Sequence, residues 1–169
     1  MKRKKDLIFH CIILMLFCQV CVPTADAVSE EKLQTISTHC EKIRESLRLV
    51  QREDSVVRTH LGPYYNTVLE KFMKPLNLRL VENNISEQRL FNNQQSFATT
   101  QNQFRDDYRA YQDALGDLVA MDCKNEPEKF YAKLEETREK RKVVATEVAK
   151  MRKLAGKQVT VLKEVLEKL

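Results

Sequence analysis

Apolar residues recur every three or four positions through three long stretches of the chain. In the first stretch they occupy alternating a and d positions of one heptad frame, and Asp54 is the one strongly polar residue among them. A stripe that repeats in this way is typical of a coiled-coil seam, which faces a partner helix continuously when the helices supercoil. The pattern predicts a first helix over about residues 30–81, with a seam made of Leu33, Ile36, Cys40, Ile43, Leu47, Val50, Asp54, Val57, Leu61, Tyr64 and Val68.

Two prolines disturb this first helix. Pro63 and Pro75 each lack the N–H that would donate to the carbonyl four residues earlier, and Gly62 stands directly before the first of them. A proline in the interior of a helix kinks or interrupts it. We therefore expect kinks near residues 62 and 75.

The second and third stretches each follow a turn sequence. Residues 82–86 combine two asparagines, which tolerate the left-handed conformation that ends helices, with Ser86, a good N-cap. The next turn ends in Pro127, and proline is favoured at the first position of a helix. The pattern predicts a second helix over 87–121 and a third over 127–168.

The second helix has an aromatic seam that becomes polar toward the turn at 82–86. Glutamines occupy two of its companion positions, Gln94 and Gln101. They fit either a wet seam that fixes the register of the helices or a polar binding surface, and we favour the first interpretation. The seventh-residue ladder is Leu90, Phe97, Phe104, Tyr111 and Leu118.

Three long helices joined by short turns must lie antiparallel to one another, because each apolar stripe needs the other two helices to bury it. Three glycines, four prolines and 31% charged residues are typical of helices rather than of sheets. The sequence thus predicts an all-α fold, an elongated antiparallel three-helix bundle or coiled coil that forms one domain over residues 28–169.

The first 27 residues differ sharply from this domain. A basic cluster at residues 2–5 precedes an almost uninterrupted apolar run over 7–22, and Ala25 and Ala27 supply small side chains at the positions that a signal peptidase reads. This arrangement predicts a signal peptide over residues 1–27 that is removed after Ala27. An uncleaved membrane anchor is the alternative, although the apolar run is short for a span of about 20 residues.

Removal of the leader would leave Cys40 and Cys123 as the only cysteines. An even pair in an exported protein suggests a single disulfide. Folding the chain at residue 84 brings both cysteines to the same end of the rod, with an axial mismatch of about 7 Å that kinks and turns can absorb. The sequence therefore predicts a Cys40–Cys123 bond, with two buried free thiols as the alternative. His39 and His60 do not have the spacing of metal ligands.

The charge and the motifs narrow the possible chemistry. The whole chain has a net charge of +5, and without the leader it has 25 basic and 22 acidic residues, a net charge of +3. This excess is too small to indicate nucleic-acid binding. The sequence contains no nucleophile elbow, no zinc-protease motif and no phosphate-binding glycine loop. We expect no catalytic residue, no cofactor site and no metal site, and hence no enzymatic activity.

The third helix carries most of the basic side chains. They predict possible contacts with an anionic polymer or with lipid headgroups, while a plain solvated helix face is the simpler interpretation. Residues 84–86 match the N-glycosylation pattern in an expected turn, so Asn84 is a candidate glycan site. The basic residues are Arg138, Lys140, Arg141, Lys142, Lys150, Arg152, Lys153 and Lys157.

The leader, the two cysteines and the aromatic motifs follow one another in a recognisable order along the chain. A basic and apolar leader precedes a cysteine at the start of a long helix, within Cys40-Glu41-Lys42-Ile43. The second helix contains a motif of F-x-x-D-Y-x-A-Y character over residues 104–111, and Cys123 lies in the turn that follows it. Phe130 and Leu134 then continue in F-x-x-x-L spacing.

This layout resembles that of the uncharacterised exported three-helix coiled-coil proteins of reduced-genome bacteria of the candidate-phyla type. The resemblance covers most of residues 28–169, and Pro63 and Pro75 depart from it. It implies a secreted or cell-surface protein with no established activity.

These observations predict an exported, non-enzymatic helical rod with a structural or protein-binding role at the cell envelope or outside the cell. Its partner is expected to be another protein or a second copy of the chain, and not a nucleic acid. Two other functions stay open. One is a periplasmic holdase-like chaperone, and the other is a module that binds membranes or anionic polymers through the third helix. The expected location is secreted, periplasmic or at the cell surface.

Overall fold

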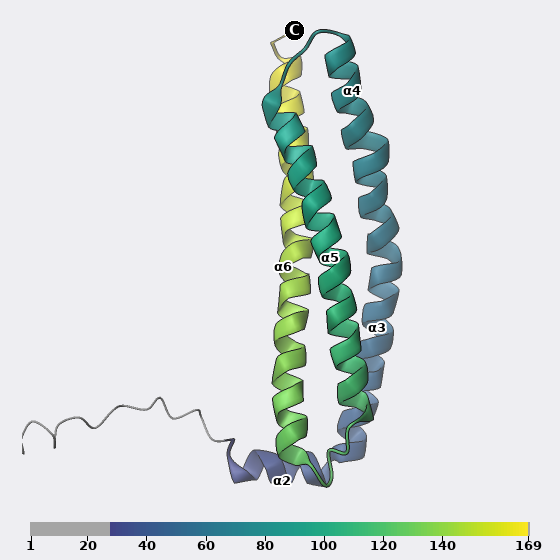
Figure 1. Ribbon diagram of the computed structural model, residues 1–169, viewed down its shortest axis with the longest axis vertical. Coiled ribbons are helices and arrows are strands. Elements are labelled where there is room, and N and C mark those ends of the chain that lie inside the picture. Colours follow the sequence, from purple (N-terminus) through teal and green to yellow (C-terminus); the bar gives the residue numbers. More distant parts are fainter. Residues whose placement is uncertain (1–27, 169) are drawn as a thin grey trace, which may run out of the picture.

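The computed structural model describes residues 28–168, and every regular element in that range is a helix (Figure 1). This finding confirms the all-α prediction for the described residues. The signal peptide predicted for residues 1–27 lies outside them. The elements are α2 (Glu30–Thr38), α3 (Cys40–Thr67), the π-helical segment η1 (Val68–Met73), α4 (Lys74–Glu82), α5 (Gln88–Ala120) and α6 (Pro127–Leu166).

The long helices lie side by side as a helical bundle, and α2 lies across one end of it (Figure 1). α3, η1 and α4 form one continuous column, which we call the first column. α5 returns antiparallel to this column, and α6 then packs against α5 along its length. The contact between α5 and α6 is by far the most extensive in the molecule. A coiled-coil supercoil stays a prediction.

The first helix differs from its prediction at His39, where the backbone leaves helical geometry (φ −106°, ψ 19°) and separates α2 from α3. The turn lets α2 cross the end of the bundle, where Ile36 joins the same buried cluster as Phe130. Ser37 Oγ donates to the carbonyl of Lys124, 2.8 Å away. The break therefore closes the end of the core, which a single straight helix would leave open.

Cys40 and Cys123 form a disulfide at this same end, with their Cα atoms 5.4 Å apart. Both residues are buried in the apolar cluster. The bond joins the start of α3 to the connection between α5 and α6, and it confirms the predicted pairing.

The two prolines do not interrupt the first column, and the kinks predicted near residues 62 and 75 stay a prediction. Pro63 stands inside α3, which continues without interruption to Thr67. Pro75 is the second residue of α4 and follows directly on the π-helical segment within the continuous column. The irregular segment is η1, Val68–Met73, between the two prolines.

The buried stripe of the first column changes register near η1. The predicted seam residue Tyr64 is 59% exposed, whereas its neighbour Tyr65 is 3% exposed. From there the buried residues follow in steps of four: Tyr65, Leu69, Met73 and Asn77. In an α-helix each such step turns the stripe by about 40°. The π-helical segment takes up one extra residue, which offsets much of this drift.

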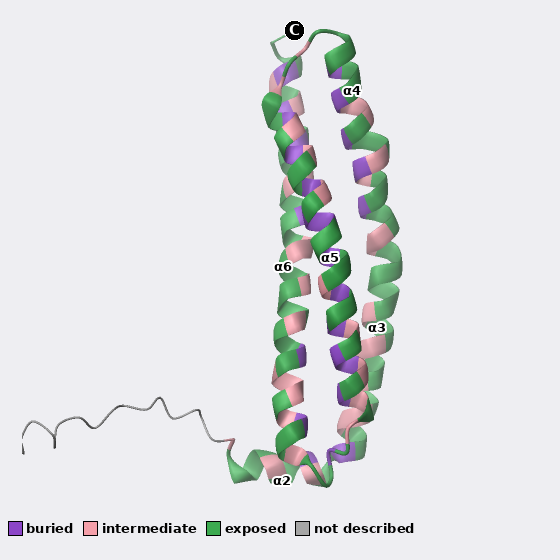
Figure 2. Ribbon diagram, viewed as in Figure 1, coloured by how far each residue is buried: buried purple, intermediate pink, exposed green. Residues whose placement is uncertain are grey.

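The predicted aromatic ladder of α5 forms the centre of the core. Its five members, from Leu90 to Leu118, are each at most 4% exposed. Buried residues concentrate along α5 and on the sides of the neighbouring helices that face it (Figure 2). α5 is therefore the helix that both other columns cover.

A layer of buried amides joins the three columns near the turn at 82–86. Asn77 Nδ2 donates to Gln94 Oε1 at 2.6 Å, and Gln158 Nε2 lies 3.5 Å from Asn77 Oδ1. Asn93 Nδ2 donates to Gln158 Oε1 at 2.8 Å. Asn93 Oδ1 has no partner among the described residues, but the other contacts of this layer bridge α4, α5 and α6 and support the interpretation that the polar seam position Gln94 fixes register.

Candidate functional site

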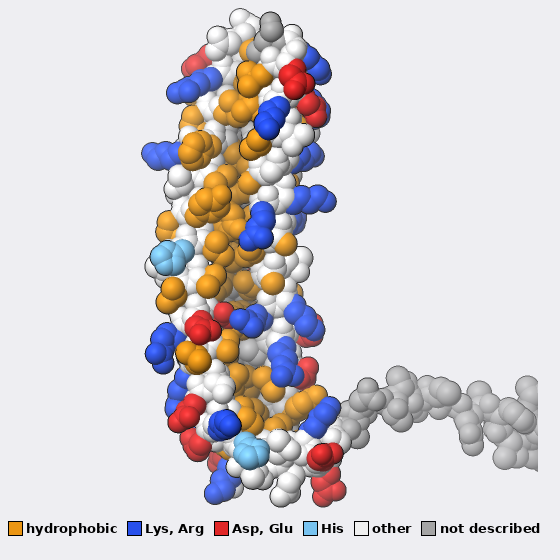
Figure 3. Space-filling model, turned by 180° about the vertical axis from the view of Figure 1, so that it is seen from behind, with side chains coloured by type: hydrophobic (Ala, Val, Ile, Leu, Met, Phe, Trp, Pro, Cys, Tyr) orange, Lys and Arg blue, Asp and Glu red, His pale blue; other side chains and the backbone are white. Residues whose placement is uncertain are grey.

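One side of the bundle is open. α5 packs against both other columns, but the first column and α6 barely touch each other. Figure 3 shows the consequence on this side, where hydrophobic side chains form a stripe along the molecule with basic residues beside it. Two hollows lie along this stripe, and each is bounded by the first column and by α6.

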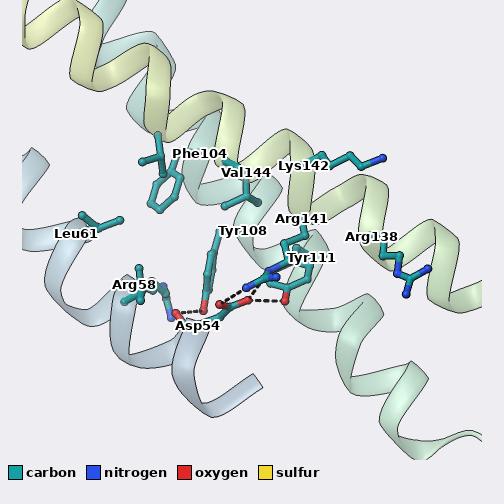
Figure 4. Close-up of a pocket in the computed structure, with 13 residues that line it drawn as sticks. Asp54, Arg58, Leu61, Phe104, Tyr108, Tyr111, Arg138, Arg141, Lys142 and Val144 are labelled. Atoms are coloured by element: carbon teal, nitrogen blue, oxygen red, sulfur yellow. Dashed lines mark hydrogen bonds and ion pairs between the residues drawn. The ribbon is translucent and has the colours of Figure 1, made fainter. Parts of the chain in front are cut away.

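The first hollow has a volume of about 550 Å³ and lies in the half of the bundle nearer the disulfide. Its floor is formed by the aromatic rings of α5, and its walls are formed by α3 and α6 (Figure 4). The lining residues are Asp54, Val57, Arg58, Leu61, Phe104, Tyr108, Tyr111, Arg138, Arg141, Lys142, Val144, Ala145 and Val148.

A polar cluster crosses this hollow at one point. Arg141 Nη2 and Nε donate to the two carboxylate oxygens of Asp54 at 2.9 and 3.0 Å. Tyr111 donates from its hydroxyl to Asp54 Oδ2 at 2.6 Å, and Tyr108 donates to the Asp54 backbone carbonyl at 3.1 Å (Figure 4). The bidentate geometry makes Asp54 a fixed link between α3, α5 and α6.

The cluster fixes the protonation states of Tyr111 and Arg141. Burial raises the pKa of Tyr111, and the hydrogen bond to Asp54 raises it further. The hydrogen bond from Arg141 to Asp54 raises the pKa of the Arg141 guanidinium. Tyr111 therefore stays protonated and Arg141 stays charged at physiological pH. Side chains that keep one protonation state are unsuited to catalytic proton transfer.

The second hollow has a volume of about 640 Å³ and lies farther along the same two walls. Three of its apolar side chains are mostly exposed: Tyr64 at 59%, Phe72 at 64% and Val159 at 54%. The other lining residues are Val68, Lys71, Met73, Pro75, Leu76, Arg79, Ala155, Gln158 and Leu162. Exposed apolar side chains gathered in this way mark interaction sites more often than scattered ones do.

The two hollows follow one another between the same two walls, and we call the pair the apolar groove. On the first column it extends from Asp54 to Arg79, and on α6 it extends from Arg138 to Leu162. At 1.5 Å per residue both walls are about 37 Å long. The groove therefore follows the bundle for most of its length.

The charged residues of the groove are almost all basic. Asp54 is the one carboxylate in the lining, and Arg141 already binds it. On the α6 wall, Arg138 pairs with Glu135 and Lys142 pairs with Glu139. On the wall of the first column, no described acidic side chain lies within ion-pair distance of the three cations, which are Arg58, Lys71 and Arg79.

The eight basic residues singled out from the third helix do not form one surface. Arg138, Arg141 and Lys142 come together at the groove. Lys140 and Lys150 pair with Glu136 and Glu147, at 3.5 and 3.8 Å. The other three are exposed: Arg152, Lys153 and Lys157.

The sequence reasoning missed the three cations of the first column. Arg58 and Lys71 each stand directly beside an apolar lining residue that is more than half exposed, namely Val57 and Phe72, whereas Arg79 has no such neighbour in the lining. A cation that flanks an apolar stripe is the expected signature of a groove rim. The sequence shows cations beside apolar residues, but such a pattern identifies the rim of a groove only when it is known that no other helix packs on the apolar stripe.

The described residues contain no group of three or more histidine, cysteine or acidic side chains placed to hold a metal ion. Nor do they contain a helix that is both long and apolar enough to cross a membrane.

No protein-family model, no curated protein and no solved structure matches the chain. The apolar groove is therefore the feature from which a function can be inferred.

Proposed function

We propose that the protein is an exported, non-enzymatic rod of three antiparallel helices that binds another protein through its apolar groove, at the cell envelope or outside the cell. The observation that carries this proposal is the groove itself, with apolar side chains left more than half exposed along it. Burying such surface is the main favourable term in protein association.

The shape of the groove supports a helical occupant. Its two walls are helices and its floor is a third helix, so an added helix would complete a four-helix bundle. Recognition of an amphipathic helix by an apolar groove is a recurring mode of protein binding. The groove is also long and narrow, which suits a helix better than a globular surface.

The polar cluster supports a binding role over catalysis. The Asp54 carboxylate already accepts hydrogen bonds from Arg141 and Tyr111, which leaves it poorly placed to act as a base. The Cys40–Cys123 bond supports export, because disulfides persist in oxidising compartments.

The two other functions have less support. Five of the eight basic residues on α6 pair with carboxylates, which weakens the case for an anionic polymer or membrane surface. A holdase-like chaperone needs an adaptable surface for unfolded clients. Here the disulfide fixes one end of the groove walls and the amide layer fixes the other.

Photocrosslinking in the native cells tests the proposal. Benzoylphenylalanine is placed at Tyr64 or Val159 inside the groove, and at Leu78 or Val143 as exposed controls on the same two walls. We expect both groove positions to crosslink to one and the same protein, and the controls to give no such adduct. Equal adducts from the controls, or none from the groove, would end the proposal. Suppression of the aggregation of unfolded clients by the purified protein would favour the chaperone instead.

A further inference from the structure

We infer that the occupant of the apolar groove is an acidic amphipathic helix of another protein, about seven turns long. This inference rests on the proposed function and adds the chemistry of the partner. It combines the length of the groove with the charge of its rims.

The length follows from the two walls. Asp54 and Arg79 mark the ends of the groove on the first column, and Arg138 and Leu162 mark them on α6. Both intervals correspond to about 37 Å, the length of a helix of about 25 residues. A shorter helix would leave one of the two hollows unfilled.

The sign of the charge follows from the wall of the first column. Arg58, Lys71 and Arg79 are distributed over the whole groove, and no described carboxylate pairs with any of them. Arg58 lies over the ring of Tyr108, 5.2 Å from its centroid, which keeps the guanidinium at the edge of the groove. Carboxylates along one flank of the bound helix would meet all three cations, and such complementarity selects partners.

The same charges argue against a second copy of the chain as the occupant. A symmetric dimer through this face would place identical surfaces together. The three lining cations that have no described carboxylate partner would then meet those of the other copy, and like charges at an interface cost several kcal/mol. The lining cations are Arg58, Lys71, Arg79, Arg138, Arg141 and Lys142.

Two designed peptides test the inference. Both are helices of about 25 residues with the same leucine stripe, and they differ only in carrying glutamate or lysine along the flanks. Binding to the full exported chain is measured by fluorescence anisotropy. We expect the glutamate peptide to bind about tenfold more tightly, ~1.4 kcal/mol, with a preference that weakens as salt is added.

Charge reversal in the protein provides the matched control. The triple variant Arg58→Glu, Lys71→Glu and Arg79→Glu should reverse the preference. Charge reversal at three exposed cations of α3 outside the groove should leave the preference for the glutamate peptide intact. This control changes the net charge of the protein by the same amount as the triple variant does. The control substitutions are Lys42→Glu, Arg48→Glu and Arg52→Glu.

The outcomes separate this inference from the proposed function. If the two peptides bind equally tightly, and neither binds the Tyr64→Glu variant, the inference of an acidic partner is overturned and the groove remains a binding site. Failure of both peptides while Tyr64 still crosslinks in cells also overturns the acidic helix alone. A dimer in light scattering that Tyr64→Glu dissociates, or a co-purified lipid that blocks the peptides, overturns the inference in favour of that occupant. If no peptide binds and Tyr64 gives no crosslink in cells, both proposals are overturned.

Discussion

Arg141 reaches from α6 to Asp54 of α3 and binds both oxygens of its carboxylate, at 2.9 and 3.0 Å. In this half of the groove the link connects two helices that otherwise scarcely contact each other. The pair is therefore a strut, a hydrogen-bonded link between the two walls that sets the width of the apolar groove. Tyr111, on the floor of the groove, donates a further hydrogen bond to Asp54.

Replacing Asp54 with Asn should destabilise the protein by about 1–2 kcal/mol, because the charge-assisted hydrogen bonds from Arg141 and Tyr111 are weakened. The value is modest because the Arg141 side chain is 56% exposed and its ion pair is screened by solvent. Urea unfolding measures the change. The matched control is Arg138→Ala, which breaks an exposed pair within α6 and should change stability by less than about 0.5 kcal/mol. Equal effects of the two substitutions would show that the strut has no special role.

Removal of the disulfide should lower the free energy of unfolding by more than Asp54→Asn does. The Cys40–Cys123 bond spans 83 positions of sequence, and removal of such a crosslink costs about 4–5 kcal/mol in the chain-entropy model. The double variant Cys40→Ser and Cys123→Ser should lose this amount in urea unfolding under non-reducing conditions. Dithiothreitol should bring the original protein to the same stability and leave the variant unchanged. A reduced protein as stable as the oxidised one would contradict the expectation.

The disulfide and the α5 ladder show what could be predicted from the sequence. Cys40 and Cys123 were paired from the count of residues on each side of one turn, and Phe97 and Phe104 were placed in the core from their spacing. Both inferences depend only on regular helices, whose rise and periodicity are fixed. The ladder holds because α5 is an uninterrupted α-helix. The pairing holds despite the π-helical segment of the first column, because it requires only that both cysteines lie at the same end of the bundle.

Tyr64 and Tyr65 show where such reasoning stops. A heptad frame assumes a constant number of residues per turn, so it cannot anticipate the π-helical segment that follows these residues. The break at His39 also depends on tertiary packing, since Ile36 is buried in a cluster with residues distant in sequence, Phe130 among them. The groove escaped prediction for a related reason, because periodicity does not show whether two apolar stripes meet.

Acid should weaken the hydrogen bonds that Glu87 accepts from Arg89 at the start of α5. The hydrogen bond from Arg89 holds the pKa of Glu87 at about 2, below its ordinary value of 4.5, and Arg89 also binds Glu164 of α6 at 2.7 Å. A lowered pKa in the folded state contributes stability above the unfolded pKa, and the contribution is lost as pH falls through the folded value. Stability should therefore decline between about pH 4.5 and pH 2, and less steeply in Glu87→Gln. A carboxyl titration of Glu87 by NMR checks the pKa directly, and a midpoint near 4.5 would contradict it.

Pro63 offers a prediction in the opposite direction, because the helix around it is regular and the proline is exposed. A proline in a helix interior is about 3 kcal/mol less favourable than alanine, since it removes a hydrogen bond and crowds the preceding turn. Pro63→Ala should therefore stabilise the protein by about 1–3 kcal/mol in urea unfolding. Pro127→Ala is the control and should have little effect, because Pro127 is the first residue of α6. If Pro63→Ala instead destabilised the protein, the proline would be required for the π-helical segment that begins five residues later, and the width of the groove would depend on it.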